Sequence, residues 1–328
     1  MSKQGPIRVG IVGFGRIGKR HAILASRHPE IELVAVCDIR KEAFDHHTTP
    51  AYDSMDAMLE SHPELDVVHI CTPNGLHGPQ ALAALEARKH VVIEKPMALT
   101  KADCEAIIFK ALQMSRQVFC VMQNRFSPPA LWIKEVIDKK LLGDIYMVQT
   151  NCYWNRHDKY YSDNEWHGTK DLDGGVLFTQ FSHFIDMLYW LFGDIKNIQT
   201  RFYNFNHQHN TAFDDSGVVS FDFINDGAGV LNFSTSLWNQ NFESSMTIIG
   251  SKGTIKIGGQ YMDKVVYCHV KDYEMPELPP TNPPNYYEDG SKGSAANHIY
   301  IFENIPVRSK RADIPYTCSP KMLWRTNY

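Results

Sequence analysis

The first 124 residues alternate short apolar runs, rich in β-branched side chains, with helix-like segments, and this alternation limits the possible fold more than any other feature. Apolar runs of this length are typical of strands that are buried on both faces of a parallel sheet. The predicted strands are residues 7–13, 32–38, 65–71, 90–94 and 117–123. The predicted helices are residues 16–28, 54–61, 77–88 and 101–115. Strands that alternate with helices predict an α/β domain with a doubly wound parallel sheet over residues 1–124.

After residue 124 the pattern changes to strands joined by short turns, which indicates an antiparallel sheet. A helix with Ser127 as its N-cap is predicted to precede these strands. The predicted strands are residues 145–153, 199–205, 217–224, 228–238, 244–249 and 253–257. Residues 174–192 are apolar nearly all round and are predicted to form one buried helix. We therefore expect residues 125–328 to form a second, α+β domain.

Charge and cysteine content exclude several classes of protein. The formal net charge is −4, with 33 basic and 37 acidic residues interspersed, so no general positive field attracts nucleic acid or anionic membrane. No stretch reaches the ~18 uncharged apolar residues of a membrane span, and the start of the chain does not resemble a secretion signal. The seven cysteines are scattered and include no CxxC pair, which indicates neither a disulfide framework nor a metal site. We expect a cytoplasmic protein with reduced thiols.

A glycine-rich segment lies between the first predicted strand and the first predicted helix. It comprises Gly13, Phe14, Gly15, Arg16, Ile17 and Gly18. In this position the first glycine allows a tight turn, the second allows the backbone to approach phosphates, and the third allows close packing of helix on strand. The segment predicts that the helix N-terminus binds the pyrophosphate of a dinucleotide in a Rossmann domain.

Asp38 ends the second predicted strand, 20 positions beyond Gly18, where a residue that binds the adenosine ribose is expected. Its carboxylate would accept hydrogen bonds from the ribose hydroxyls and repel a 2′-phosphate, which favours NAD over NADP. Arg40 keeps NADP as an alternative cofactor, because its guanidinium can pair with the 2′-phosphate.

Two polar segments follow the third and fourth predicted strands, at the edge where open α/β sheets bind ligands. The first contains Thr72, Pro73, Asn74 and His77, and the second contains Glu94 and Lys95. A lysine in this position could hold a substrate hydroxyl and assist proton transfer. By spacing alone, it could equally be a solvated lysine at a strand end.

His183 lies within the predicted buried helix, with Thr179 and Asp186 at spacings that place all three on one face. An imidazole titrates near neutrality and suits a base that takes an alcohol proton. A hydrogen-bonded core histidine is the alternative. Residues 153–169 combine basic and aromatic side chains that could hold a sugar ring and an anionic group, or form an ordinary aromatic interface.

In this order, the motifs GFGRIG, CTPNGLH, EKP and GGVLFTQFSHFID resemble the glucose-fructose oxidoreductase / inositol dehydrogenase (Gfo/Idh/MocA) family over nearly the whole chain. The resemblance implies an NAD-binding Rossmann domain over residues 1–124. It also implies a substrate-binding and oligomerisation domain with a large open antiparallel sheet over residues 125–328, and Lys95 and His183 as the catalytic pair. The implied cofactor contacts are Gly13, Phe14, Gly15, Arg16, Ile17, Gly18, Asp38, Ile39, Thr72, Pro73, Asn74, His77, Glu94, Lys95, Gln123 and Trp166.

Further motifs, QNRFSPP and YWNR among them, resemble the branch of UDP-N-acetyl-2-amino-2-deoxyglucuronate dehydrogenases. That resemblance implies oxidation of the 3-hydroxyl of UDP-N-acetylglucosaminuronic acid with NAD, on the way to surface polysaccharide such as lipopolysaccharide O-antigen. The implied substrate contacts are Lys95, Asn124, Arg125, Arg156, Tyr160, Thr179, Gln180 and His183.

Two positions depart from the family pattern. Thr179 stands where many members carry Asp, which argues against a carboxylate-dependent inositol or glucose oxidation, and His167 stands where Arg is common. The alternatives are an inositol or polyol dehydrogenase, a keto-sugar reductase, and a non-catalytic NAD-sensing regulator. A homodimer or homotetramer is expected by family resemblance, and a 2-keto acid is a possible second substrate for cofactor recycling.

Overall fold

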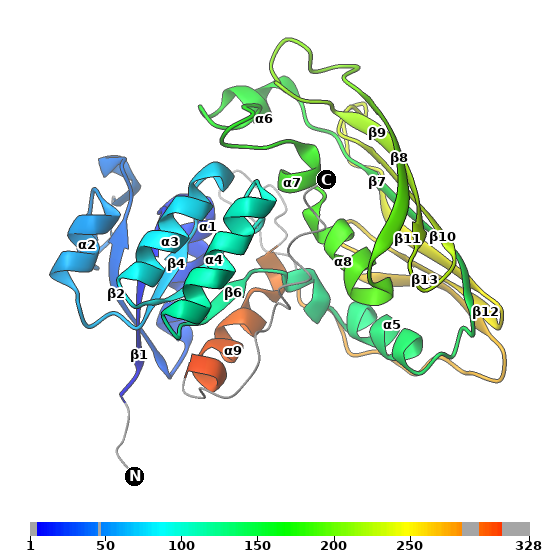
Figure 1. Ribbon diagram of the computed structural model, residues 1–328, viewed down its shortest axis with the longest axis horizontal. Coiled ribbons are helices and arrows are strands. Elements are labelled where there is room, and N and C mark those ends of the chain that lie inside the picture. Colours follow the sequence, from blue (N-terminus) through cyan, green and yellow to red (C-terminus); the bar gives the residue numbers. More distant parts are fainter. Residues whose placement is uncertain (1–4, 45–46, 284–294, 310–328) are drawn as a thin grey trace. The chain divides into compact units, whose positions relative to one another are not determined.

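The computed structural model describes residues 5–44, 47–283 and 295–309, and the chain divides into two units (Figure 1). Met122–Pro283 forms the second unit, and the rest of the chain forms the first. Residues 295–309, which the sequence assigns to the second domain, belong to the first unit, where helix α9 (Ile299–Ser309) packs against helix α1 (Arg16–Arg27). The sequence beyond residue 309 lies outside the described residues.

The first unit contains a six-stranded sheet in the order β3-β2-β1-β4-β5-β6. It is wholly parallel, as the sequence predicts, but its short edge strand β3 was not predicted. Its strands are β1 (Ile7–Val12), β2 (Ile31–Cys37), β3 (Ala51–Tyr52), β4 (Val67–Ile70), β5 (His90–Ile93) and β6 (Val118–Cys120). Its other helices are η1 (Lys41–Phe44), α2 (Met55–Ser61), η2 (Asn74–Leu76), α3 (His77–Glu86), α4 (Lys101–Gln113) and η4 (Ala295–Asn297). The strand order reverses between β1 and β4, which is where sheets of this kind bind their ligands.

Local sequence signals explain where several helices begin. The hydroxyl of Thr100 accepts the N–H of Asp103 at 3.1 Å, so Thr100 caps the start of α4. Ser127 caps α5 (Pro128–Asp138) in the same way, accepting the N–H of Ala130 at 3.3 Å. The predicted cap at Ser127 is confirmed.

The second unit contains a seven-stranded sheet in the order β13-β12-β11-β7-β10-β9-β8. Its strands are β7 (Ile145–Tyr153), β8 (Ile195–Tyr203), β9 (Ser216–Phe223), β10 (Ala228–Ser234), β11 (Glu243–Gly250), β12 (Gly253–Gly258) and β13 (Lys264–Val270). All neighbours are antiparallel except β7 and β10, which run parallel because helices and two strands separate them in the chain. The predicted antiparallel sheet is therefore mixed at its centre, and β13 was not predicted.

The buried segment at residues 174–192 is two helices, where the sequence predicts one. Helix α7 (Val176–Thr179) ends because the N–H of Phe181 bonds back to the carbonyl of Val176 at 2.9 Å, and α8 (Ser182–Phe192) begins after this turn. Thr179 and His183 are consequently not on one continuous helix. Helices α5 and α8 pack against one face of the sheet and build an apolar core with it (Figure 1).

Two short helices complete the second unit, η3 (Gln123–Phe126) and α6 (Asp158–Ser162). Among the described residues, none of the helices combines the length and the apolar character needed to cross a bilayer.

Candidate active site

The glycine-rich segment forms the turn from β1 into α1, as predicted. Gly13 has a φ of +86°, and a Cβ there would lie 2.7 Å from the backbone of Cys71 and Thr72. A Cβ on Gly18 would lie 1.9 Å from the carbonyl oxygen of Gly13. At Gly15 a Cβ would meet only the Arg40 guanidinium, at 3.4 Å. The first and last glycines are therefore required by the fold, whereas the middle one leaves open the approach that a pyrophosphate needs.

Asp38 lies beside this turn. Its carboxylate accepts the N–H of Phe14 at 2.8 Å, and the N–H and guanidinium of Arg40 at 2.9–3.1 Å. Burial raises the pKa of Asp38, but these hydrogen bonds outweigh it and bring the pKa below its usual value. An ionised carboxylate next to the glycine turn suits the ribose hydroxyls of NAD. The neighbouring Ile39 is 85% exposed.

The loops after β4 and β5 are tied together by His77. Its ring nitrogens lie 2.9 Å from the carbonyl oxygen of Thr72 and 2.6 Å from that of Pro96. Since His77 is buried and both nitrogens face the protein, it holds the loops that carry Thr72, Asn74 and Lys95. Asn74, at the start of η2, is buried as well.

Lys95 follows β5 and is partly buried, and its peptide bond to Pro96 is cis. Its N–H lies 3.2 Å from Oε2 of Glu94. The other carboxylate oxygen of Glu94 faces His21 and His298 within the first unit. Glu94, which was predicted to contact the cofactor, is therefore turned into the protein.

In the second unit, two contacts join η3 to α8. The amide of Gln123 lies 3.1 Å from Nε2 of His183, which fixes the imidazole ring. One turn further on, Asp186 accepts both ends of the Arg125 guanidinium, with Nε at 2.7 Å. Arg125, predicted to contact substrate, is thus occupied by an ion pair. Asn124 between them is buried, and its Nδ2 has no hydrogen-bond partner among the described residues.

Arg156 lies at the centre of a second group of predicted substrate residues. Its Nε and Nη2 donate to Oε1 of Gln180 at 2.9 and 2.6 Å. The Gln180 amide in turn donates to the hydroxyl of Tyr160, whose ring stacks on His167 at 4.3 Å. The guanidinium also lies over the ring of Tyr160, at 5.2 Å. Burial raises the pKa of Tyr160 to about 12, so its hydroxyl stays protonated.

Thr179 and Trp166 border this group. The Thr179 hydroxyl donates to the buried carboxylate of Asp173, which also accepts the N–H of Gly168 at 2.9 Å. A carboxylate is therefore present beside Thr179 although it comes from another position in the chain. Trp166 packs on His167, with ring centroids 3.9 Å apart.

Comparison with known proteins gives a consistent result. Residues 7–122 match the model described as oxidoreductase family, NAD-binding Rossmann fold, and residues 131–256 match the GFO/IDH/MocA C-terminal domain. The chain belongs to the GFO/IDH/MocA family. It is therefore an NAD-dependent oxidoreductase, and the glycine turn with Asp38 fits that cofactor.

Individual relatives are distant in sequence. Inositol 2-dehydrogenase of Salmonella typhimurium is 32% identical over 205 residues, which cover 60% of this chain and 58% of that protein. An uncharacterized oxidoreductase of Synechocystis, sll0816, is 24% identical over 81% of this chain and 76% of its own length. The WlbA dehydrogenase of Bordetella pertussis, crystallised with NADH and UDP-GlcNAcA, is 28% identical. It has a TM-score of 0.86 over 98% of this chain and 93% of its own.

Several residues around the GFO/IDH/MocA site are not evident from the sequence. His21 and His298 contact Glu94 although they are 73 and 204 positions from it in the sequence. No local sequence pattern predicts contacts over such separations. His207 lies 3.0 Å from Asp215 and 2.7 Å from the carbonyl of Arg156, so it supports the backbone that carries this arginine.

Proposed function

We propose that this oxidoreductase acts on a nucleotide-linked sugar and oxidises the 3-hydroxyl of UDP-N-acetylglucosaminuronic acid. One observation carries the proposal: the partly buried guanidinium of Arg156 is held by neutral groups, and no carboxylate pairs with it in the described part of the chain. Its positive charge is therefore available to an anionic ligand. The similarity to the Bordetella pertussis dehydrogenase, whose structure contains UDP-GlcNAcA, supports the choice of ligand.

A uronic acid offers the anion that such a group recognises. A guanidinium binds a carboxylate through parallel hydrogen bonds, and Gln180 and Tyr160 hold the plane of Arg156 in advance. The aromatic face of Trp166 suits a sugar ring, and the buried Nδ2 of Asn124 suits a sugar hydroxyl. We assign Arg125 to fixing η3 against α8, because Asp186 occupies its guanidinium.

The proposed chemistry follows the catalytic pair that the family resemblance implies. His183 takes the proton of the sugar hydroxyl, and Gln123 keeps its ring in one orientation. Lys95 supplies a positive charge that stabilises the developing alkoxide. Bound NAD supplies the hydride acceptor. The matching of Lys95 and His183 to the positions of the family motif supports this division of roles.

The test is to follow NADH absorbance with purified protein, NAD and UDP-N-acetylglucosaminuronic acid, with and without a 2-keto acid. NADH formation, or sugar oxidation that needs the keto acid, is expected. UDP-N-acetylglucosamine, which lacks the carboxylate, is the matched control and should react far more slowly. Turnover of inositol with no turnover of either nucleotide sugar would replace this proposal with a polyol dehydrogenase. NAD binding with no turnover of any sugar would favour the regulator.

We also propose that the second unit forms a homodimer or homotetramer through the face of its sheet opposite α5 and α8. Every residue of β8 from Lys196 to Tyr203 is exposed, and Val266 and Tyr267 of β13 are more than half exposed. Exposed apolar side chains on an open sheet are typical of an interface. Light scattering after gel filtration should give a mass of two or four chains, and a monomer at micromolar concentration would contradict this.

A further inference from the structure

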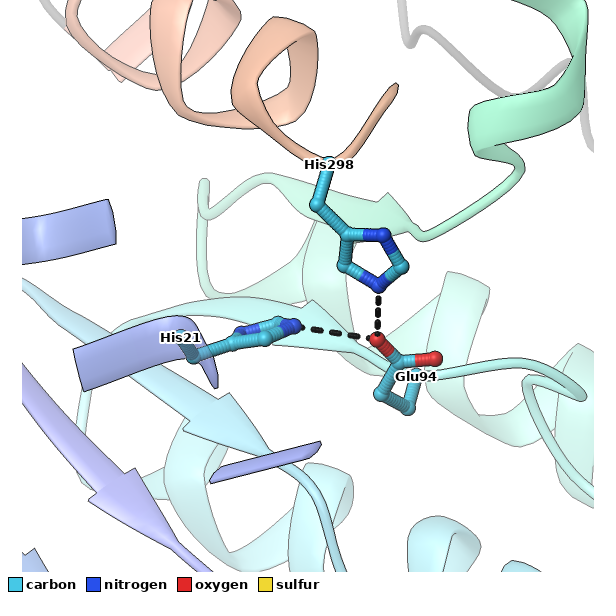
Figure 2. A group of neighbouring side chains, drawn as sticks. All are labelled: His21, Glu94 and His298. Atoms are coloured by element: carbon cyan, nitrogen blue, oxygen red, sulfur yellow. Dashed lines mark hydrogen bonds and ion pairs between the residues drawn. The ribbon is translucent and has the colours of Figure 1, made fainter. Parts of the chain in front are cut away.

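Glu94 is the centre of a buried polar cluster in the first unit (Figure 2). Its Oε1 lies 3.0 Å from Nε2 of His21 on α1 and 2.8 Å from Nε2 of His298, just before α9. All three residues are at most 7% exposed. Both imidazoles point at the same carboxylate oxygen, so both act as N–H donors to it.

The remaining hydrogen bonds of the cluster agree with an ionised Glu94. Nδ1 of His21 lies 2.8 Å from Nδ1 of His69, and one proton between them completes the chain. Burial lowers the pKa of His21 below its usual value, although Glu94 opposes this. Burial also raises the pKa of Glu94, but His298 and His21 outweigh it and hold that pKa well below its usual value. The carboxylate is therefore a buried anion that three donors share.

The third donor is the backbone N–H of Lys95, which lies 3.2 Å from Oε2. One oxygen of Glu94 is thus held by two histidines and the other is directed to the peptide of Lys95. Rotation of the Glu94 carboxylate would break its contacts with the two histidines. With Oε1 held in this way, Oε2 is fixed too, and it restricts the position of the Lys95 N–H.

The same cluster fixes α9. Phe302 on α9 is fully buried, and its ring lies 5.4 Å from that of His21 and 5.2 Å from that of His69. His298 and Phe302 therefore dock the helix on the histidines that hold Glu94. Through these contacts the docking of α9 and the position of the Lys95 peptide depend on each other.

We propose that Glu94 is a positioning residue for Lys95, and that His21 and His298 are the groups that hold it in place. The proposal deepens the proposed function and rests on the role given there to Lys95. His21, Glu94 and His298 could also be metal ligands, because their ligand atoms lie within 4.8 Å of one another. Hydrogen bonds account for these contacts without an ion, and metal content is an outcome of the test.

The first experiment is a double-mutant cycle between Glu94→Gln and Lys95→Ala. A glutamine places an N–H or a weaker acceptor against two imidazole donors, so we expect kcat to fall roughly 10- to 100-fold, as for a misplaced catalytic group. KM for the sugar and the Kd for NAD should change less than about twofold. In the Lys95→Ala background, Glu94→Gln should lower kcat no further, because Glu94 acts through the lysine. An equal additional loss would show that Glu94 acts independently and would overturn the proposal.

His298→Gln is the second variant. It should also lower kcat and leave KM unchanged, and it tests the proposal if Glu94→Gln does not fold.

His90→Gln is the matched control. His90 lies on β5, the strand that ends just before Glu94. It accepts the N–H of Gln117 at 3.0 Å and does not contact Glu94. Its replacement should leave kcat unchanged. A similar loss of kcat in His90→Gln would attribute the effect to general loosening of β5.

Hydrogen–deuterium exchange separates failure of this proposal from failure of the proposed function, because it requires no substrate. Amides of peptides that cover Lys95 and α9 should exchange faster in Glu94→Gln and His298→Gln, and at the wild-type rate in His90→Gln. Unchanged exchange would overturn the proposal even if the enzyme oxidises the sugar. Stoichiometric zinc or iron in the purified protein would also overturn it, since the cluster would then be a metal site.

Discussion

Arg156 shows how single side chains define this site. Its guanidinium is oriented by Gln180, by a backbone carbonyl and by the face of an aromatic ring, none of which carries a negative charge. Because the Arg156 guanidinium is oriented but its charge is not neutralised, it can bind an anion. Asp38 is the opposite case, since Arg40 already neutralises it.

Replacement of Arg156 by lysine should weaken binding of the carboxylated sugar, because an ammonium cannot make the parallel hydrogen bonds of a guanidinium. We expect kcat/KM to fall by about 10- to 100-fold, corresponding to roughly 1.5–3 kcal/mol for hydrogen bonds to a charged group. The effect should lie mainly in KM. Steady-state kinetics on UDP-N-acetylglucosaminuronic acid measures it. Lys159→Ala, three positions along, is the control, and an equal loss there would remove the special role of Arg156.

Replacement of Asp38 by asparagine should increase the use of NADP relative to NAD. The asparagine oxygen can still accept the N–H of Phe14, but the charge is gone and Arg40 is released to pair with a 2′-phosphate. We expect the ratio of kcat/KM for NAD to that for NADP to fall at least about tenfold. The double variant Asp38→Asn with Arg40→Ala should lose the gain in NADP use. An unchanged ratio in the single variant would contradict this role of Asp38.

At the scale of helices and strands, the sequence predicts those features that residues close together in the chain determine, such as helix caps and tight turns. The capping residues Thr100 and Ser127 indicate where α4 and α5 begin, and the glycine spacing indicates the turn into α1. It does not predict contacts set by the tertiary fold. The apolar pattern of residues 174–192 has no breaker, so the turn at Phe181 follows from packing and from Asp173. Likewise, the two histidines of Glu94 come from α1 and the start of α9, and only the folded chain brings them together.

The turn between α7 and α8 should depend on the hydroxyl of Thr179. Thr179→Val keeps the shape but removes the hydrogen bond to the buried carboxylate of Asp173, which retains the N–H of Gly168. We expect the free energy of unfolding to fall by about 1–3 kcal/mol, the cost of a buried acceptor that loses a partner. Thr179→Ser, which retains the hydroxyl, should lose much less. Denaturant unfolding of the two variants measures the difference, and equal stabilities would contradict the assignment.

At the scale of the whole molecule, the two sheets differ in how they use buried polar groups. The parallel sheet of the first unit contains or borders several buried or half-buried histidines whose pKa values burial lowers, including His21, His69, His77 and His90. In the second unit, His207 is buried with Asp215, and this partner outweighs burial and raises its pKa. The two units should therefore respond in opposite ways to mild acid.

The first unit should lose stability as the pH falls below the pKa of an exposed histidine, about 6.5. The lowered pKa values of His21, His69, His77 and His90 mean that the unfolded state binds more protons than the folded state as the pH falls, so stability rises with pH. For His90, whose pKa burial lowers to about 4, the window runs from pH 6.5 down to about 4. His207 has the opposite sign: its raised pKa contributes stability that is fully present below pH 6.5 and is lost as the pH rises through the folded value. Hydrogen–deuterium exchange at pH 7.5 and 5.5, corrected for the intrinsic rate, should show β4 and β5 opening more readily at the lower pH, with a smaller change in His90→Gln. Opening of β4 and β5 that does not vary with pH would mean that these histidines are protonated in the folded protein.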